Sequence, residues 1–242
     1  MEFTGKAVLV TGASSGIGAQ IARRFAELGA DVAINSSKSQ EAGEAVAEQI
    51  GGIYCRADIA DDDAARGMID EVVESFGRLD VVVNNAGATQ VIPHDDLEAV
   101  TDELWEKILG VNVLGTWHVT RAAVPHLQKA ENASVINITS IAGIRNLGSS
   151  IPYAVSKAGL NHMTGLLAKV LGPGIRVNAV APGLVDTPWT KSWDDLRAYV
   201  AKTVPMRRPA TDDDVAEACL YLARSTFVTG DVIVVDGGHQ LV

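Results

Sequence analysis

The chain has 242 residues, of which 47% are hydrophobic, and its formal net charge at pH 7 is −10. This length and composition are typical of a single domain with a sizeable buried core, and they argue against a disordered chain. The acidic balance, without an arm rich in lysine and arginine, argues against a general surface for nucleic acids or anionic membranes.

Cysteines and targeting signals further limit the possible functions. Cys55 and Cys219 are far apart and match no metal-binding or redox spacing, so we expect two buried apolar thiols and no metal site. The first six residues lack the pattern of a signal peptide, and no apolar run is long enough to span a bilayer. We therefore predict a cytoplasmic protein with no membrane or nucleic-acid partner.

Seven short apolar runs recur along the chain, with helical patterns between them. They cover residues 7–10, 32–34, 53–55, 79–83, 134–138, 175–180 and 232–235. Because these runs are continuously apolar rather than alternating, both faces of their sheet should be covered, as in parallel sheets. The alternation predicts an α/β fold: a single-domain doubly wound Rossmann fold over residues 1–242, with a seven-stranded, mostly parallel sheet and helices on both faces.

The helical patterns have recognisable starts and spacings. The acidic triplets at 61–63 and 212–214 each suit a helix N-terminus, because negative side chains are favoured there. Long helices are expected over residues 104–127 and 153–171. The irregular segment 183–209 carries several aromatic side chains, so we expect a flap over a substrate pocket, although packing against the body of the protein would explain them equally well.

A glycine-rich turn, TGASSGIG at residues 11–18, joins the first strand to an amphipathic helix. Its glycines allow a tight turn and the close approach of a pyrophosphate, and the helix N-terminus offers free N–H donors. The spacing is GxxxGxG rather than GxGxxG. We interpret this turn as a site for a dinucleotide.

The end of the second strand bears on which dinucleotide binds. A carboxylate there would hold the ribose 2′-hydroxyl of NAD, whereas a neutral or basic site suits the 2′-phosphate of NADP. This strand ends in Ser36, Ser37 and Lys38, with no carboxylate. The pattern favours NADP, with NAD as the alternative and with Lys38 as a solvated loop charge if no phosphate binds.

The stretch YAVSK places Tyr153 and Lys157 one helical turn apart, on the same face. A positive charge near a phenol favours the phenolate and lowers its pKa, so the pair could act as a general acid and base. An exposed tyrosine and lysine without a role would give the same pattern.

Taken together, the motifs resemble those of the classical short-chain dehydrogenase/reductase family, most closely its 3-oxoacyl-(acyl-carrier-protein) reductase-like or sugar and alcohol dehydrogenase-like members. The resemblance rests on TGASSGIG, NNAG at 84–87, Asn112, Ser140, YAVSK, RVNAVAPG at 176–183 and the ending TG…VDGG. It covers essentially the whole chain in order. Two departures stand out: the turn at 171–175 looks one residue short, and Ser15 occupies a position that is usually basic in NADP-preferring members.

The resemblance implies a set of cofactor-binding residues. Those at the pyrophosphate and adenosine are Gly12, Ser14, Ser15, Gly16, Ile17, Gly18, Asp58 and Ile59. Those at the nicotinamide and its ribose are Asn85, Ala86, Gly87, Tyr153, Lys157, Pro182, Gly183, Val185 and Thr187.

The resemblance also implies an activity, the interconversion of a small-molecule ketone and a secondary alcohol. Ser140 ends the fifth strand, and ligands bind beyond the carboxyl ends of such strands. There it would donate a hydrogen bond to the carbonyl oxygen while Tyr153 supplies the proton. Lys157 would lower the pKa of Tyr153 and bind the nicotinamide ribose, and Asn112 would hold a water that relays protons.

Other readings remain open. An NAD-dependent polyol or hydroxysteroid dehydrogenase would carry similar motifs, and a dinucleotide-sensing protein without catalysis would keep the fold. His94 and Arg145 are candidates for substrate contacts, although solvated side chains explain both at least as well. The resemblance further implies a homo-tetramer, or a dimer, formed through the two long helices and the apolar C-terminal end.

Overall fold

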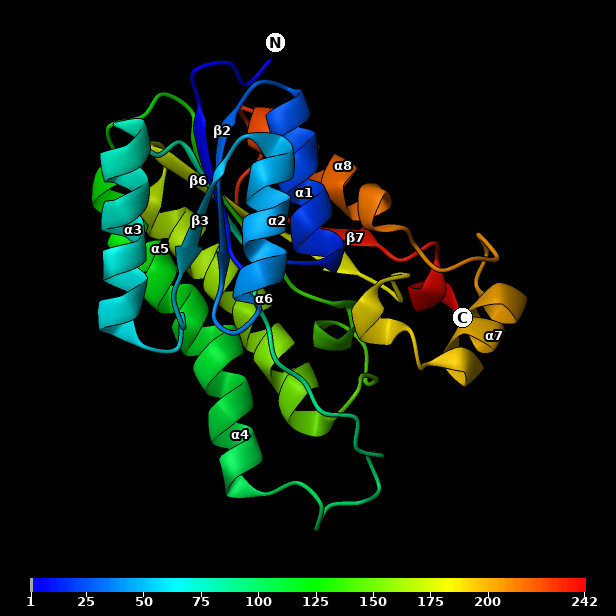
Figure 1. Ribbon diagram of the computed structural model, residues 1–242. Helices are drawn as coiled ribbons and strands as arrows, with labels where there is room; N and C mark the ends of the chain where they lie inside the picture. The colour runs from blue at the N-terminus through cyan, green and yellow to red at the C-terminus, as the bar shows by residue number, and fades with distance from the viewer. Residues whose placement is uncertain (1) are drawn as a thin grey trace.

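The computed structural model of the protein describes residues 2–242 and is built around one seven-stranded sheet (Figure 1). The strands are β1 (Ala7–Val10), β2 (Asp31–Ser36), β3 (Ile53–Arg56), β4 (Val81–Asn84), β5 (Ala133–Ile138), β6 (Ile175–Pro182) and β7 (Val232–Val235). They lie in the order β3-β2-β1-β4-β5-β6-β7, and every neighbouring pair is parallel. The predicted Rossmann fold is confirmed, and the sheet is parallel throughout rather than mostly so.

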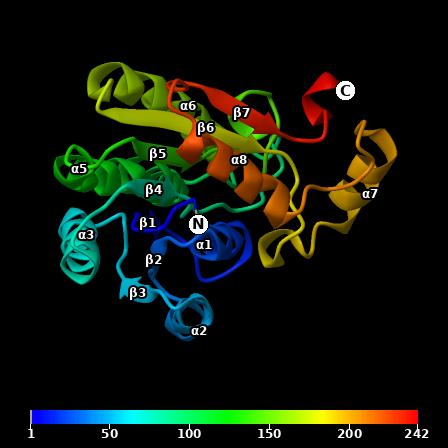
Figure 2. The same ribbon diagram turned by 90° about the horizontal axis from the view of Figure 1, so that it is seen from above.

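Helices cover both faces of the sheet, as Figure 2 shows from above. One face packs against α1 (Gly16–Glu27), α2 (Gln40–Ile50) and α8 (Asp212–Arg224), and the other against α3 (Asp62–Phe76), α5 (Thr116–Leu127) and α6 (Ile151–Leu171). Side chains alternate between the two cores along a strand, so Val8 and Val10 face the first group while Leu9 faces the second. Each such buried side chain stabilises the fold by roughly 1.5–3 kcal/mol.

The acidic triplets begin helices, as predicted. The Asp61 carboxylate accepts a hydrogen bond from the Ala64 amide at the start of α3. Thr211 and Asp214 form a reciprocal capping box at the start of α8. These caps satisfy N–H groups that the first turn of a helix leaves free.

The helix expected over residues 104–127 has a more complex structure. It starts at Asp102 as α4 (Asp102–Leu109), continues through a π-helical segment, η1 (Gly110–Gly115), and ends as α5. Such segments contain an extra residue in the turn. The other long helix, α6, begins two residues earlier than expected, with Pro152 in its first turn.

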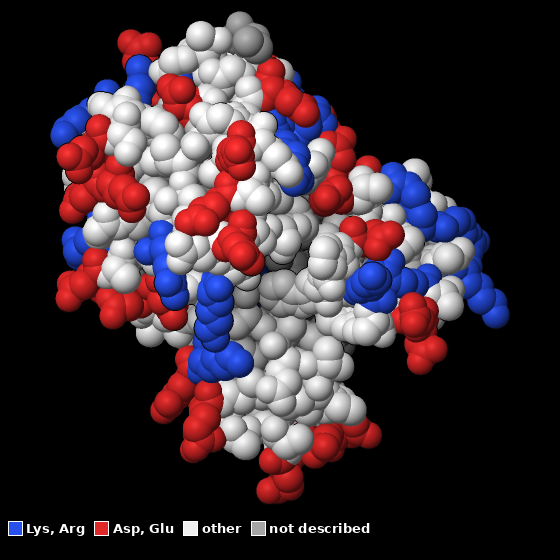
Figure 3. Space-filling model, in the orientation of Figure 1, with Lys and Arg blue, Asp and Glu red and all other residues white. Residues whose placement is uncertain are grey.

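The segment 183–209 projects from one end of the sheet and contains η3 (Pro188–Thr190) and α7 (Asp194–Thr203) (Figure 1). Its small core consists of Leu184, Val200 and Val204. Figure 3 shows several lysine and arginine side chains close together on this projecting segment, with a few acidic side chains among them. Across residues 2–242, no helix combines the length and the apolar character needed to cross a membrane.

Candidate active site

The carboxyl ends of the strands open into a cleft of about 1360 Å³ that the segment 183–209 borders on one side. Pockets for a single small ligand usually measure about 300–1,000 Å³, so this cleft has room for a dinucleotide and a second molecule. Every residue predicted to bind the cofactor lines it, from Gly12 in the first turn to Thr187 in the segment. The contacts of these residues with a cofactor remain predictions.

The glycine-rich turn packs against the end of β4 without spare room. Gly12 has a φ of +62°, and a Cβ added there would lie 2.6 Å from the Cα of Ala86. A Cβ on Gly18 would lie 2.4 Å from the Asn85 Nδ2 atom. Only glycine fits at either position, because real Cβ atoms essentially never approach other atoms so closely.

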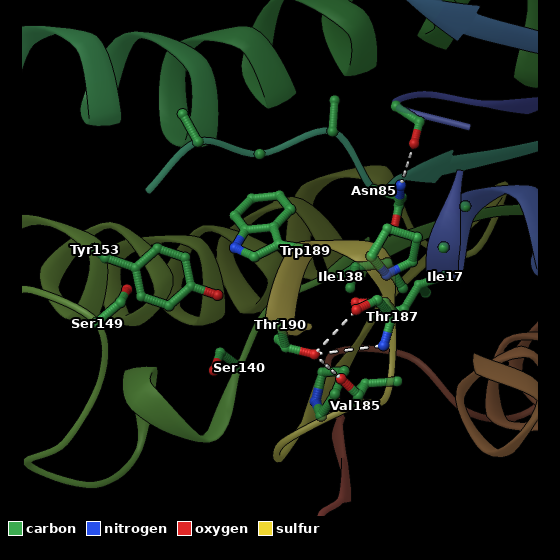
Figure 4. A pocket seen from close by; sticks show the side chains of 18 of the residues that line it. Ile17, Asn85, Ile138, Ser140, Ser149, Tyr153, Val185, Thr187, Trp189 and Thr190 are labelled. Atoms are coloured by element: carbon green, nitrogen blue, oxygen red, sulfur yellow. Dashed lines mark hydrogen bonds between the residues drawn. The ribbon is translucent and has the colours of Figure 1, made fainter. Parts of the chain in front are cut away.

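Hydrogen bonds join the same two loops. The Thr11 hydroxyl accepts from the Asn85 and Ala86 amides, each at 3.1 Å. The Asn85 Nδ2 donates to the Thr11 and Gly12 carbonyls, each at 2.9 Å, and Figure 4 shows Asn85 in this position. The N-cap residue of α1, Ser15, makes no side-chain capping bond, so the first N–H groups of this helix are free for an anion. The donor set and the glycine turn therefore fit a dinucleotide.

At the adenosine end, several polar side chains have partners within the protein. The Asn35 amide donates to the carbonyls of Cys55 and Ala57 and thereby ties β2 to β3. The Ser36 hydroxyl lies 3.2 Å from the Ser39 carbonyl, its acceptor, and 3.0 Å from the Tyr54 hydroxyl. Ser36 therefore fixes the turn, and Ser37 and Lys38 are the predicted phosphate ligands that the turn leaves available.

Tyr153 and Lys157 lie in the first two turns of α6, and both line the cleft. The Lys157 side chain is 4% exposed, and its Nζ donates to the Ile138 carbonyl at 2.8 Å. The same Nζ lies 5.7 Å from the centre of the Tyr153 ring. Burial lowers the pKa of Lys157 to about 8. Lys157 is thus buried and Tyr153 is partly buried, which excludes an exposed surface pair.

The surroundings of Tyr153 shift its pKa upward. Burial raises the pKa of this phenol, and the Ser140 hydroxyl partly opposes that shift. The Lys157 ammonium donates to the Ile138 carbonyl and lies over the Tyr153 ring, and its lowering of the phenol pKa stays a prediction. The phenol therefore stays protonated at neutral pH.

Ser140 follows β5 and caps the short helix η2 (Ile141–Gly143), where its hydroxyl accepts from the Ala142 amide at 3.1 Å. This helix presses on α6: a Cβ on Gly143 would lie 2.6 Å from the backbone carbon of Lys157. Close backbone packing thus sets the position of Ser140 relative to Tyr153. Figure 4 shows both side chains on the same side of the cleft.

Asn112 is fully buried in η1, and its side chain is bonded to protein groups. Its Oδ1 accepts from the Ala88 amide at 2.7 Å, and its Nδ2 donates to the Ala88 carbonyl and the Ser156 hydroxyl at 3.0 and 2.9 Å. Both amide hydrogens are therefore used. These contacts fix the loop at Ala88 against α6, and the role of Asn112 in holding a water stays a prediction.

The substrate end contains residues that sequence reasoning assigned only loosely or missed. Trp189, Trp193 and Tyr199 line the cleft, as a flap would require, and the Trp189 ring lies near Gly87. His239 also lines it, with its ring centre 6.0 Å from that of Tyr199. No local pattern near the C-terminus indicates this contact, because it depends on how the last residues fold back onto α7.

Two weaker candidates lie elsewhere. His94 is exposed and does not line the cleft. The Arg145 guanidinium donates to the Gln240 carbonyl and so holds the C-terminal turn in place. Thr190, which was not predicted, anchors the start of the flap through the Val185 and Thr187 carbonyls, as Figure 4 shows.

Comparisons with known proteins agree with this geometry. A family model described as enoyl-(acyl carrier protein) reductase matches residues 12–240. The Streptomyces violaceoruber protein named "Granaticin polyketide synthase putative ketoacyl reductase 2" is 53% identical over 237 residues, which cover 96% of this chain and 95% of the relative. A 3-oxoacyl-(acyl-carrier-protein) reductase of Thermotoga maritima is 38% identical over 247 residues, which cover 98% of this chain and 99% of the relative.

Solved structures show the same relationship. A short-chain dehydrogenase from Burkholderia cenocepacia in complex with NADP is 36% identical, with a TM-score of 0.90 over 98% of this chain and 99% of that one. A 3-ketoacyl-(acyl-carrier-protein) reductase from Brucella melitensis complexed with NADH is 32% identical, with a TM-score of 0.91 over 97% and 98%. The chain belongs to the short-chain dehydrogenase/reductase family, as a 3-oxoacyl-(acyl-carrier-protein) reductase-like, NAD(P)-dependent oxidoreductase of ketones and alcohols.

Proposed function

We propose that this enzyme reduces a ketone on an acyl chain to a secondary alcohol and that NADPH is its reductant. The observation that carries the proposal is the convergence of Ser140, Tyr153 and Lys157 at one end of a cleft whose other end is a glycine-rich turn. Bound NADPH would supply a hydride to the carbonyl carbon. The protein has to supply a proton and stabilise the charge that grows on the carbonyl oxygen.

In this proposal Tyr153 is the general acid. Its raised pKa keeps the hydroxyl protonated at neutral pH, which suits donation to the carbonyl oxygen in the direction of reduction. The Ser140 hydroxyl donates a second hydrogen bond to the same oxygen. Lys157, whose pKa is about 8, would bind the nicotinamide ribose and return a proton to Tyr153.

The choice of NADP over NAD is supported by the end of β2. No carboxylate stands there to hold a ribose 2′-hydroxyl, and Ser37 and Lys38 line the cleft. One related structure holds NADP and another holds NADH, so the family accommodates both.

The segment 183–209 is proposed to form the substrate side of the site. Its aromatic rings give the cleft an apolar wall that suits an acyl chain. The named activities of the relatives, ketoacyl and 3-oxoacyl reduction, support a 3-oxoacyl thioester as the substrate class.

Assembly as a homo-tetramer, or as a dimer, also stays a proposal, as does the cytoplasmic location. Apolar side chains are exposed on the two long helices that the family resemblance implicates, at Leu114, Trp117, Leu166 and Val170. Phe227, just before β7, is fully exposed. Partner copies would cover such surfaces.

The substitution Tyr153→Phe tests the proposal, because it removes the hydroxyl and keeps the ring. With an acetoacetyl thioester as substrate, the rate of NADPH oxidation should fall by at least about 100-fold, the usual effect of losing a general acid. NADPH affinity, measured by fluorescence titration, should stay within about two-fold of the wild type. Tyr221→Phe, at an exposed position on α8, is the matched control and should be neutral. Near-normal turnover by Tyr153→Phe would rule out the mechanism.

A further inference from the structure

The last residues of the chain form a short helix, η4 (His239–Leu241), which lies next to the segment that carries α7 (Figure 1). Asp236, just after β7, holds the turn that leads into this helix. The Asp236 carboxylate accepts from the Gly238 amide at 2.8 Å and from the Gln240 amide at 2.7 Å, and its backbone carbonyl accepts from the His239 amide at 3.1 Å. These bonds fix the backbone of His239, and with it the direction in which the side chain leaves the turn.

Three parts of the protein hold this turn in place. A Cβ added to Gly183, just after β6, would lie 3.0 Å from the Cα of Asp236. The Met206 amide, after α7, donates to the Gly237 carbonyl at 3.1 Å, and the Arg145 guanidinium, after η2, donates to a carbonyl of η4. Gly183 is a predicted nicotinamide contact, and η2 follows the serine of the proposed active site. The turn therefore connects the nicotinamide end of the cleft, the flap and the serine loop.

The His239 side chain lines the cleft and is partly buried. Its ring centre lies 6.0 Å from that of Tyr199, and the two ring planes are tilted by 50°. Its Nδ1 atom is buried and has no hydrogen-bond partner within residues 2–242, although buried polar atoms nearly always have one. By contrast, the Nδ1 atom of His118 lies 3.1 Å from the Ile59 carbonyl oxygen. The His239 ring is therefore held in position while its polar atoms are not engaged.

The environment of the two ring nitrogens of His239 indicates which of them can meet a ligand. Nδ1 is buried, so Nε2, which bonds no group of residues 2–242 either, is the nitrogen that is open to the cleft. A neutral imidazole carries one proton, and buried N–H groups without an acceptor are rarer than unpaired acceptors. The proton therefore belongs on Nε2, which makes this atom a hydrogen-bond donor at the substrate end of the cleft.

We propose that His239 donates a hydrogen bond from Nε2 to the thioester carbonyl of the substrate and thereby selects 3-oxoacyl thioesters over ketones that lack this second carbonyl. This inference rests on the proposed function, in which Ser140 and Tyr153 bind the reacting ketone and leave the thioester oxygen without a partner. A single methylene separates the two carbonyls of such a substrate. His239 takes no part in proton or hydride transfer. It determines specificity, because an analogue without the acceptor leaves its donor unpaired.

The test compares two methyl ketones of equal chain length, the S-ethyl thioester of acetoacetate and 2-heptanone, of which only the first has a second carbonyl. The readout is the ratio of kcat/KM for the thioester to kcat/KM for 2-heptanone, so the intrinsic reactivities cancel when a variant is compared with the wild type. His239→Leu should lower this ratio by about three- to ten-fold, the usual effect of losing one hydrogen bond, mainly through KM. NADPH affinity, measured by fluorescence titration, should stay within about two-fold.

Two further variants show whether the hydrogen bond itself matters. His239→Gln should keep part of the ratio, because the glutamine side chain also ends in an N–H donor. His94→Leu is the matched control, since His94 is an exposed histidine that does not line the cleft, and it should leave the ratio unchanged. An equal fall of the ratio in His94→Leu would show that the effect does not come from the C-terminal turn and would overturn the assignment.

The remaining outcomes separate the inference from the proposed function. If the wild type oxidises NADPH with neither ketone, the proposed function fails, and the assignment of His239 fails with it. If the wild type reduces the thioester and His239→Leu keeps the ratio, even with both rates lowered, His239 has only a structural role and the proposed function stands. If His239→Leu and His239→Gln lower the ratio equally, the shape of the ring matters rather than its donor, and the inference is again overturned.

Discussion

The dinucleotide end and the substrate end of the cleft are built in opposite ways. At the first, an added Cβ on Gly12 or Gly18 would come within 2.6 Å of the facing loop, and Thr11 and Asn85 join the two loops by hydrogen bonds. At the second, Trp189 and Tyr199 are about half exposed. The first end therefore accepts a narrow range of ligand shapes, whereas the second end has more freedom to adjust to its ligand.

The two ends of the cleft differ because different numbers of contacts hold them to the body of the protein. The loops at the dinucleotide end are short and lie between strands at the centre of the sheet. The segment 183–209 has its own small core and joins the body mainly at its ends, through bonds such as that of the Gly183 amide to the Val235 carbonyl. Segments with few buried contacts open at a lower free energy than the core does.

The pH dependence of stability caused by Lys157 is the largest effect that we expect, because close packing keeps its ammonium group away from water. Its pKa falls from 10.5 to about 8 in the fold, so between these values the unfolded chain binds more protons than the native state. The free energy of unfolding should therefore rise as the pH increases from about 8 towards 10.5. Below pH 8 the full cost of burying the Lys157 ammonium should lower the free energy of unfolding.

Urea unfolding of the wild type and of Lys157→Met on both sides of this window measures the effect, since other titrations cancel in the difference. We expect the stability of the wild type relative to the variant to increase by roughly 1–3 kcal/mol across the window. A constant difference would mean that Lys157 is hydrated in solution and that this end of the cleft is less tightly packed than described.

Gly12→Ala tests the tight packing directly. The new Cβ meets the backbone of Ala86 at 2.6 Å and forces a positive φ on a residue with a side chain. The free energy of unfolding should fall by about 1–3 kcal/mol, and affinity for the dinucleotide should fall with it. Gly67→Ala, on the exposed side of α3 with open space around it, is the control and should gain about 0.5–1 kcal/mol. Equal effects of the two changes would contradict the contrast.

Tyr199→Ala should have the smallest effect and should be confined to the substrate end. Removing a half-exposed ring that lines the cleft and lies near His239 should raise KM for the ketone by about three- to ten-fold. NADPH affinity should be unchanged, and the free energy of unfolding should move by less than about 0.5 kcal/mol. Steady-state kinetics with a fluorescence titration separates these quantities. A matching loss of NADPH affinity would show that the two ends are coupled.

Local patterns predicted the fold well because they reflect local causes. Continuous apolar runs marked the strands of a covered sheet, and the acidic triplets marked helix starts that Asp61 and Thr211 then cap. The glycine spacing in the first turn likewise reflects a local backbone requirement.

The details of the site depend on which groups meet in three dimensions. The hydrogen bond from Lys157 to the Ile138 carbonyl, and the burial that raises the pKa of Tyr153, follow from how α6 packs against β6 and η2. The position of His239 follows from a turn that brings its ring near that of Tyr199. None of these has a signal in neighbouring residues.

The π-helical segment η1 between α4 and α5 changes the direction in which the side chains of α5 point relative to those of α4. Successive residues of a regular helix are rotated by about 100° about the helix axis. One extra residue in a turn therefore rotates the side chains of all later residues about that axis. The side chains of Leu104 and Ile108 before the segment and of Val119 and Ala123 after it are all buried, although they belong to different parts of the core. A regular helix over the same residues could not direct both sets of side chains into their clusters. The irregular turn therefore lets one continuous helical element pack against two different parts of the core.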